Sequence, residues 1–185
     1  MDNPNRVVST RTEGNDSMKI SELVDELLKI KKSDIAKLRE LVDRSKQVIM
    51  IGNGGSNSIC SHISQDYTKQ LHKKAYGFSD PSRLTCYIND YGRDDAYAQF
   101  IDEFHCSETL VVLISSSGNS TNIIRCAQLC TRKSIDFIVL TGFDDDNDLR
   151  KNFSNVALVD MWVDSHDYGV VETTHQAFLH SIVGD

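Results

Sequence analysis

Two glycine- and serine-rich segments carry residue types that bind small anions. They are Gly52–Ser56 (GNGGS) and Ser115–Ser120 (SSSGNS). Glycines let the backbone approach an anion closely, and the N–H groups that open a following helix point at it with the positive end of the helix dipole. Serine hydroxyls add hydrogen-bond donors without adding charge. Together the two segments predict a phosphate-binding site, although either one alone is typical of a tight turn with a capping serine.

The sequence details of both segments narrow the choice of ligand. Neither segment ends in the Gly-Lys-Ser/Thr sequence of a nucleotide-binding P-loop. Asn57 stands where the dinucleotide-binding fingerprint requires a glycine. A nucleotide is therefore disfavoured, and a small phosphate compound is the predicted ligand.

Histidines and carboxylates occur at helical spacing in two other places. His62 and Asp66 are four residues apart, so they could share a divalent ion such as zinc or act as an acid–base pair. Glu172 and His175 are neighbours on a helix in the same way, whereas about 12 Å of helical rise separates Glu172 from His180. Taken alone, such a pair is more commonly a solvated or ion-paired helix surface, and a single histidine is more commonly structural than a ligand.

These residues need a scaffold, and the hydrophobic pattern predicts one. Short β-branched and apolar runs predict buried strands at 48–51, 84–88, 110–114, 135–140 and 156–159. Helical periodicity predicts helices starting near Ser17 and Ser33, at 56–72, 94–104 and 121–133, and from about Val171 onwards. This alternation indicates an α/β fold with a mainly parallel sheet covered by helices. Both anion-binding segments then follow strands, at the carboxyl edge of the sheet where ligands bind.

The composition limits the domain organisation and the classes of function. Of 185 residues, 39% are hydrophobic and 25% are charged, which excludes a disordered or fibrous chain. We expect one domain over 17–185, preceded by a mobile polar tail, 1–16. The net charge of −7 would repel nucleic acid, so we expect no nucleic-acid partner. The aliphatic runs are too short to span a membrane and Met1–Arg6 is too polar for a signal peptide, so we expect a cytoplasmic protein without a membrane partner.

In this order, the segments resemble the sugar isomerase domain family. Within it they resemble the phosphoheptose isomerases, which interconvert sedoheptulose 7-phosphate and D-glycero-D-manno-heptose 7-phosphate. The likeness runs from about Ser17 to the end of the chain and rests on Gly52–Ser56, His62, Asp66, Asn89–Gly92, Ile114–Ser120, Leu140–Gly142, Glu172, His175 and His180. The resemblance implies a flavodoxin-like three-layer sandwich. It also implies a homotetramer that the N-terminal helices help to join, with active sites between subunits.

The resemblance further implies an aldose–ketose isomerase that acts on a sugar phosphate through an enediolate. Asp66 and His180 would transfer the protons, and a zinc ion would act as a Lewis acid on the carbonyl and hydroxyl oxygens. The implied zinc ligands are His62, Asp66, Glu172 and His180. The implied substrate-binding residues are Asn53, Gly54, Ser56, Asp90, Ser115, Ser116, Ser117, Ser120 and Glu172.

The chain departs from the family pattern near the sugar. Asp66 stands where the family has glutamate, Glu172 where it has glutamine, and Gly169 where it has aspartate. The shorter Asp66 side chain changes the reach of the base, and Glu172 adds a negative charge to the ligand set. Two alternatives therefore stay open: an isomerase of another ketose phosphate, and a non-catalytic sugar-phosphate-binding or adaptor protein of the same fold.

Overall fold

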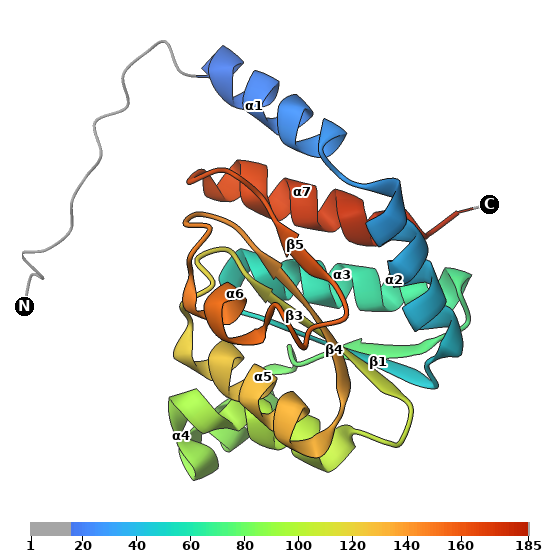
Figure 1. Ribbon diagram of the computed structural model, residues 1–185. Coiled ribbons are helices and arrows are strands. Elements are labelled where there is room, and N and C mark those ends of the chain that lie inside the picture. The colour runs from blue at the N-terminus through green and yellow to red at the C-terminus, as the bar shows by residue number, and fades with distance from the viewer. Residues whose placement is uncertain (1–15, 185) are drawn as a thin grey trace, which may run out of the picture.

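Short apolar segments pair side by side in one parallel sheet of five strands, in the order β2-β1-β3-β4-β5. The computed structural model describes residues 16–184 and is drawn in Figure 1. The strands are β1 (Gln47–Gly52), β2 (Lys74–Gly77), β3 (Thr109–Ser115), β4 (Asp136–Thr141) and β5 (Asp160–Trp162). The helices are α1 (Asp16–Leu28), α2 (Lys32–Arg44), α3 (Gly54–Gln70), α4 (Pro81–Phe104), α5 (Thr121–Lys133), α6 (Asp148–Phe153) and α7 (Tyr168–His180). Apart from Asp16, the predicted tail 1–16 lies outside the described residues.

Helices cover both faces of the sheet, as Figure 1 shows. On one face α2, α3 and α7 bury residues such as Leu41, Ile63 and Phe178. On the other face α4, α5 and α6 bury residues such as Phe100 and Leu149. Every residue of β1 and β3 is buried because both faces are covered, which explains why these strands are continuous apolar runs. The predicted α/β class and three layers are confirmed. Helix α1 lies outside the layer of α2, α3 and α7 and packs against α7.

The strand order creates a crevice at the carboxyl ends of β1 and β3. The chain leaves β1 for β2 on one side, whereas it leaves β3 for β4 on the other. The connections that follow β1 and β3 therefore diverge at the carboxyl ends of these two strands. The two strands are paired along their length, from Gln47 opposite Thr109 to Gly52 opposite Ile114. In open α/β sheets this point is the usual place for a ligand.

The strand predicted at 84–88 is wrong, because this segment lies in α4. Gly92, with φ 78° and ψ 163°, divides α4 into two helical segments. The segments fold back on each other, since the hydroxyls of Tyr87 and Tyr91 both donate to the Glu103 carboxylate, Tyr91 at 3.2 Å. In a straight helix Tyr87 and Glu103 would be roughly 24 Å apart. The α4 region is therefore a helical hairpin.

Two further strands differ from the sequence prediction. The short edge strand β2 (Lys74–Gly77) is not predicted, because it is only partly buried and lacks a β-branched run. The strand predicted at 156–159 begins later, at Asp160, although Leu158 and Val159 already make backbone hydrogen bonds to Phe137 and Val139. Among the described residues, none of the helices combines the length and apolar character that crossing a bilayer requires.

Candidate active site

The first glycine-rich segment turns the chain from β1 into α3. Gly54 has a φ of 53°, a left-handed conformation that glycine adopts without a steric penalty. At Gly55 a Cβ atom would come within 2.2 Å of Glu172 Oε2, so a side chain there would displace this carboxylate. Asn53 is the N-cap residue of α3, and Ser56 is buried in its first turn.

The serine-rich segment makes the corresponding turn from β3 into α5. Gly118 has a φ of 64°, and a Cβ atom there would lie 2.0 Å from the Asn147 side chain. Ser115 Oγ donates to Ser120 Oγ at 3.3 Å. The buried Ser116 hydroxyl has no hydrogen-bond partner within residues 16–184, so its proton is available to a ligand.

Two asparagine side chains join these turns across the crevice. Each amide of Asn53 and Asn122 donates to the other's carbonyl oxygen, at 3.0 and 2.9 Å. Asn122 lies in the first turn of α5 and is buried. Sequence reasoning misses Asn122, because nothing in its local pattern separates it from an ordinary helical asparagine.

A pocket of about 240 Å³ opens between the two turns. The lining residues are Asn53, Gly54, Gly55, Ser56, Ile114, Ser115, Ser116, Ser117, Ser120, Tyr168 and Glu172. All the predicted substrate-binding residues except Asp90 are therefore brought together. Tyr168 is an addition that carries no motif in the sequence.

The electrostatics of this pocket are set by helix ends and one carboxylate. The N-termini of α3 and α5 both face it, and each directs unpaired N–H groups and partial positive charge toward an anion. Glu172 is the charged side chain among the described lining residues, and its burial raises the pKa of that carboxyl. The two helix N-termini therefore favour an anionic group at the serine turn, and the Glu172 carboxylate lies at the start of α3.

Asp90 lies elsewhere in the chain described here. It is exposed on the first segment of α4, where its carboxylate contacts Cys86 Sγ at 3.5 Å and the Asn89 amide at 3.0 Å. It is not among the residues that line the pocket.

Three of the four predicted metal ligands meet between α3 and α7. The ligand atoms of His62, Asp66 and His180 all lie within 4.8 Å of one another. Asp66 Oδ2 is 3.0 Å from His180 Nε2 and 3.5 Å from His62 Nε2. The His62 imidazole is half exposed and the His180 imidazole is partly exposed, whereas the Asp66 carboxylate is largely covered. We call this cluster the His–Asp–His trio.

Glu172 is the fourth predicted ligand, and it lies apart from the trio. Its carboxylate covers Gly55 at the start of α3, whereas His180, at the end of α7, contacts Asp66 in the last third of α3. The two helices therefore run in parallel, and about 12 Å of helical rise separates Glu172 from His180. The structure assigns Glu172 to the pocket between the turns.

His175, which shares a helix with both residues, is structural. It is fully buried, and its Nε2 donates to the Thr141 carbonyl at 2.9 Å. Burial lowers the pKa of this imidazole from 6.5 to about 4, so it is neutral at pH 7. It is not part of the His–Asp–His trio.

Comparison with known proteins identifies relatives of the chain. No family model matches it. A phosphoheptose isomerase of Hamiltonella defensa is 29% identical over 144 residues, which cover 75% of this chain and 68% of that protein. A phosphoheptose isomerase of Buchnera aphidicola is 37% identical over 102 residues, which cover 52% of this chain and 53% of that protein. The match thus spans about two thirds of the first relative's length and about half of the second's.

The fold is shared with a solved structure. The phosphoheptose isomerase of Neisseria gonorrhoeae matches with a TM-score of 0.78 and 22% identity, over 90% of this chain and 92% of that chain. The parallel sheet and its flanking helices agree with the fold that the sequence motifs predict. The chain is therefore similar in sequence to these two phosphoheptose isomerases, and it shares the fold of the Neisseria gonorrhoeae structure.

Proposed function

We propose that this chain is an aldose–ketose isomerase that converts sedoheptulose 7-phosphate into D-glycero-D-manno-heptose 7-phosphate. Curated homologues named phosphoheptose isomerase support a sugar-phosphate isomerase. The observation that carries the proposal is the parallel packing of α3 and α7. It sets an anion pocket at the start of both helices and the His–Asp–His trio farther along them. A phosphate and the reacting carbons of one extended sugar can therefore bind along the same two helices.

The phosphate belongs at the serine turn in this proposal. The free Ser116 hydroxyl, the hydroxyls of Ser115, Ser117 and Ser120, and the N-terminus of α5 offer donors to it. The sugar would extend past Asn53 and Glu172 toward the trio. Binding energy from the remote phosphate then positions the reacting carbons.

The trio fits a zinc-type ion by its donor set and its spacing. Two imidazoles and one carboxylate are common zinc ligands, and three protein ligands leave a position open for substrate. Ligand atoms about 2.0–2.1 Å from a tetrahedral ion lie about 3.4 Å apart. The separations of Asp66 Oδ2 from the two histidines, 3.0 and 3.5 Å, are close to this value. His62, Asp66 and His180 would hold Zn²⁺, which supplies Lewis-acid polarisation of the sugar oxygens when it is bound.

Asp66 and His180 are the residues that move protons in this mechanism. Isomerisation needs a base to remove a proton from the carbon next to the carbonyl and an acid to protonate the oxygen. Asp66 supplies the carboxylate that acts as the base. His180 Nε2 donates to that carboxylate at 3.0 Å. An imidazole nitrogen that binds an ion carries no proton, so His180 would supply or recover the second proton only while its Nε2 is not bound to the ion.

The test is proton NMR of sedoheptulose 7-phosphate in deuterated water with the purified chain. It is run with zinc, after chelation, and again after zinc is restored. We expect an aldoheptose phosphate that carries deuterium at carbon 2, lost on chelation and recovered with zinc. Product formation that resists chelation would contradict the metal role but keep the isomerase.

A parallel substrate panel separates the remaining functions. If the chain isomerises a different ketose phosphate and does not isomerise sedoheptulose 7-phosphate, the proposed substrate is wrong and the proposed reaction stands. Saturable sugar-phosphate binding without isomerisation or exchange on any substrate would replace the enzyme by a binding or adaptor protein.

We also propose a cytoplasmic homotetramer that is joined in part by α1. Ile20, Val24 and Leu28 are spaced four residues apart on this helix and are exposed. An apolar helix face that its own chain leaves uncovered is typical of a subunit interface.

A further inference from the structure

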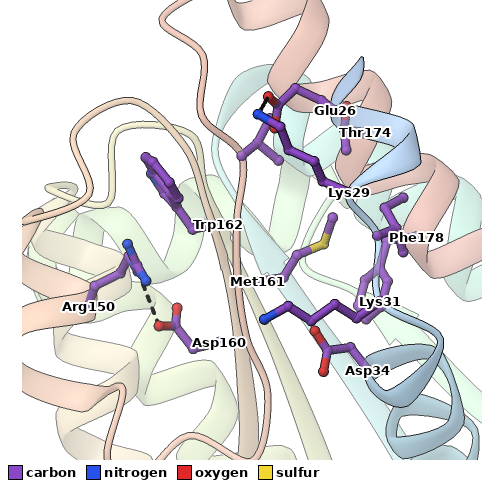
Figure 2. Close-up of a pocket in the computed structure, with 12 residues that line it drawn as sticks. Glu26, Lys29, Lys31, Asp34, Arg150, Asp160, Met161, Trp162, Thr174 and Phe178 are labelled. Atoms are coloured by element: carbon purple, nitrogen blue, oxygen red, sulfur yellow. Dashed lines mark hydrogen bonds and ion pairs between the residues drawn. The ribbon is translucent and has the colours of Figure 1, made fainter. Parts of the chain in front are cut away.

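A second pocket lies between the α1–α2 connection and the edge strand β5, as Figure 2 shows. Its volume is about 150 Å³. It has no described lining residue in common with the pocket between the glycine and serine turns. Met161 and Trp162 of β5 and Phe178 of α7 provide apolar walls, and charged side chains provide the rest. The enzyme mechanism proposed above makes no use of it.

Lys31 supplies this pocket with an available ammonium group. Lys29, two residues earlier, is already paired with the buried Glu26 at 2.5 Å. Within the described part of the chain, Lys31 makes no ion pair or side-chain hydrogen bond, although it lines the pocket. In Figure 2 its side chain extends toward Asp160. Such an ammonium group can pair with the anionic group of a ligand.

Asp160 supplies a complementary acceptor. Its Oδ2 accepts from Arg150 Nε at 3.1 Å, whereas its Oδ1 is buried and has no donor among residues 16–184. Arg150 is held by other contacts, because Nη1 donates to the Asp145 carbonyl at 2.9 Å and the guanidinium lies 5.1 Å from the centre of the Trp162 ring. A buried acceptor without a donor is unfavourable, so a ligand hydroxyl that donates to Oδ1 would be stabilising.

The size and the net charge of the pocket limit the remainder of the ligand. A volume of about 150 Å³ admits on the order of ten non-hydrogen atoms. Three cations and three carboxylates line it, so it accommodates few negative charges: Lys29, Lys31, Arg150, Glu26, Asp34 and Asp160. We propose that this pocket binds a small hydroxylated anion, whose phosphate or carboxylate pairs with Lys31 and whose hydroxyl donates to Asp160 Oδ1.

Trp162 makes the test selective, because it is the single tryptophan of the chain. The full chain is titrated with glycerol 3-phosphate and, separately, with glycerate, which distinguish a phosphate from a carboxylate. Tryptophan fluorescence reports on this pocket, and calorimetry measures binding independently. We expect saturable binding of at least one probe. Lys31→Gln should weaken it about tenfold, the effect of losing one charge-assisted hydrogen bond.

Three controls make the outcome decisive. Lys32→Gln changes an exposed lysine that does not line the pocket, and it should leave the affinity unchanged. The double variant Ser115→Ala, Ser120→Ala alters the other pocket and should also leave it unchanged. Propyl phosphate lacks the hydroxyl and should bind more weakly than glycerol 3-phosphate.

Several results would overturn the proposal. They are the absence of calorimetric binding for both probes, an equal affinity in Lys31→Gln, and loss of binding only in the serine double variant. Equal affinity for propyl phosphate and glycerol 3-phosphate would overturn the role of Asp160. None of these results depends on whether the chain isomerises a sugar phosphate.

Discussion

Among single residues, Asp66 is the proposed base; it lies between two histidines and is largely covered from solvent. Asp66→Asn keeps the size of the side chain but replaces the carboxylate by an amide that cannot take up a proton at neutral pH. We expect kcat to fall by about 10²–10⁴-fold. KM should change little, because the serine turn is untouched. Steady-state kinetics on the purified chain measure both constants.

The matched control for that substitution is Asp43→Asn, which makes the same chemical change at an exposed position on α2. Its kcat should equal that of the unmodified chain. A similar kcat in both variants would remove Asp66 from the mechanism.

His175 gives a prediction about stability and pH. Its folded pKa of about 4 lies below its ordinary value of 6.5, so the unfolded chain binds the proton more tightly. The stability associated with the neutral imidazole is therefore complete above pH 6.5 and is lost as the pH falls toward 4. The total loss is about 3 kcal/mol, of which about 2 kcal/mol is reached by pH 5. Urea unfolding at pH 7 and pH 5 measures this difference in the free energy of unfolding.

His175→Gln tests the cause of that pH dependence. The glutamine amide can still donate to the Thr141 carbonyl but does not titrate in this range. The variant should lose about 2 kcal/mol less than the unmodified chain between pH 7 and pH 5. An identical pH dependence in both chains would assign the effect to other groups.

Spacing in the sequence predicts some of the site and not the rest. His62 and Asp66 meet because residues four apart share one face of any helix. The contact of Asp66 with His180, and the separation of Glu172 from both, depend on how α3 and α7 pack. No local pattern contains that information, which is why four predicted metal ligands become a trio and a separate carboxylate.

Among the elements, the α4 hairpin depends on the conformation of one glycine. Gly92 has φ 78° and ψ 163°, a combination that is accessible essentially only to glycine, and a Cβ atom there would meet nothing within 4 Å. Gly92→Ala should therefore reduce the free energy of unfolding by about 1–3 kcal/mol through backbone strain alone. Urea unfolding measures the loss.

Gly77→Ala provides the comparison for that variant. Gly77 has no left-handed φ, and its nearest neighbour would lie 3.4 Å from the new Cβ atom. The Gly77→Ala variant should therefore lose less free energy of unfolding than the Gly92→Ala variant. If Gly77→Ala loses as much free energy of unfolding as Gly92→Ala, or more, then the φ of 78° is not the cause of the destabilisation at Gly92.

The error at 84–88 shows where apolar composition misleads. The run resembles a strand, yet Asp80 and Pro81 precede it, and both are helix-start residues. In the structure Asp80 Oδ1 accepts from the Arg83 N–H at 2.8 Å, which caps the helix. The long runs of β1, β3 and β4 are predicted correctly because both of their faces are buried, a condition that the edge strand β2 does not meet.

For the molecule as a whole, the exposed face of α1 predicts how subunits assemble. Ile20, Val24 and Leu28 are 67%, 48% and 79% exposed, and they follow one face of the helix. If this face joins subunits, Val24→Asp would place a charge in an apolar contact, which is strongly unfavourable. We expect the variant to have a lower mass by light scattering during size-exclusion chromatography.

Ser33→Asp introduces the same charge at an exposed position outside α1, in the first turn of α2, and it should keep the mass of the unmodified chain. An unchanged mass in Val24→Asp as well would show that assembly does not use α1. The site gives a second readout, because α1 packs against α7 and α7 carries both Glu172 and His180. Dissociation at α1 should therefore lower isomerase activity along with the mass, whereas Asp66→Asn should lower activity and leave the mass unchanged.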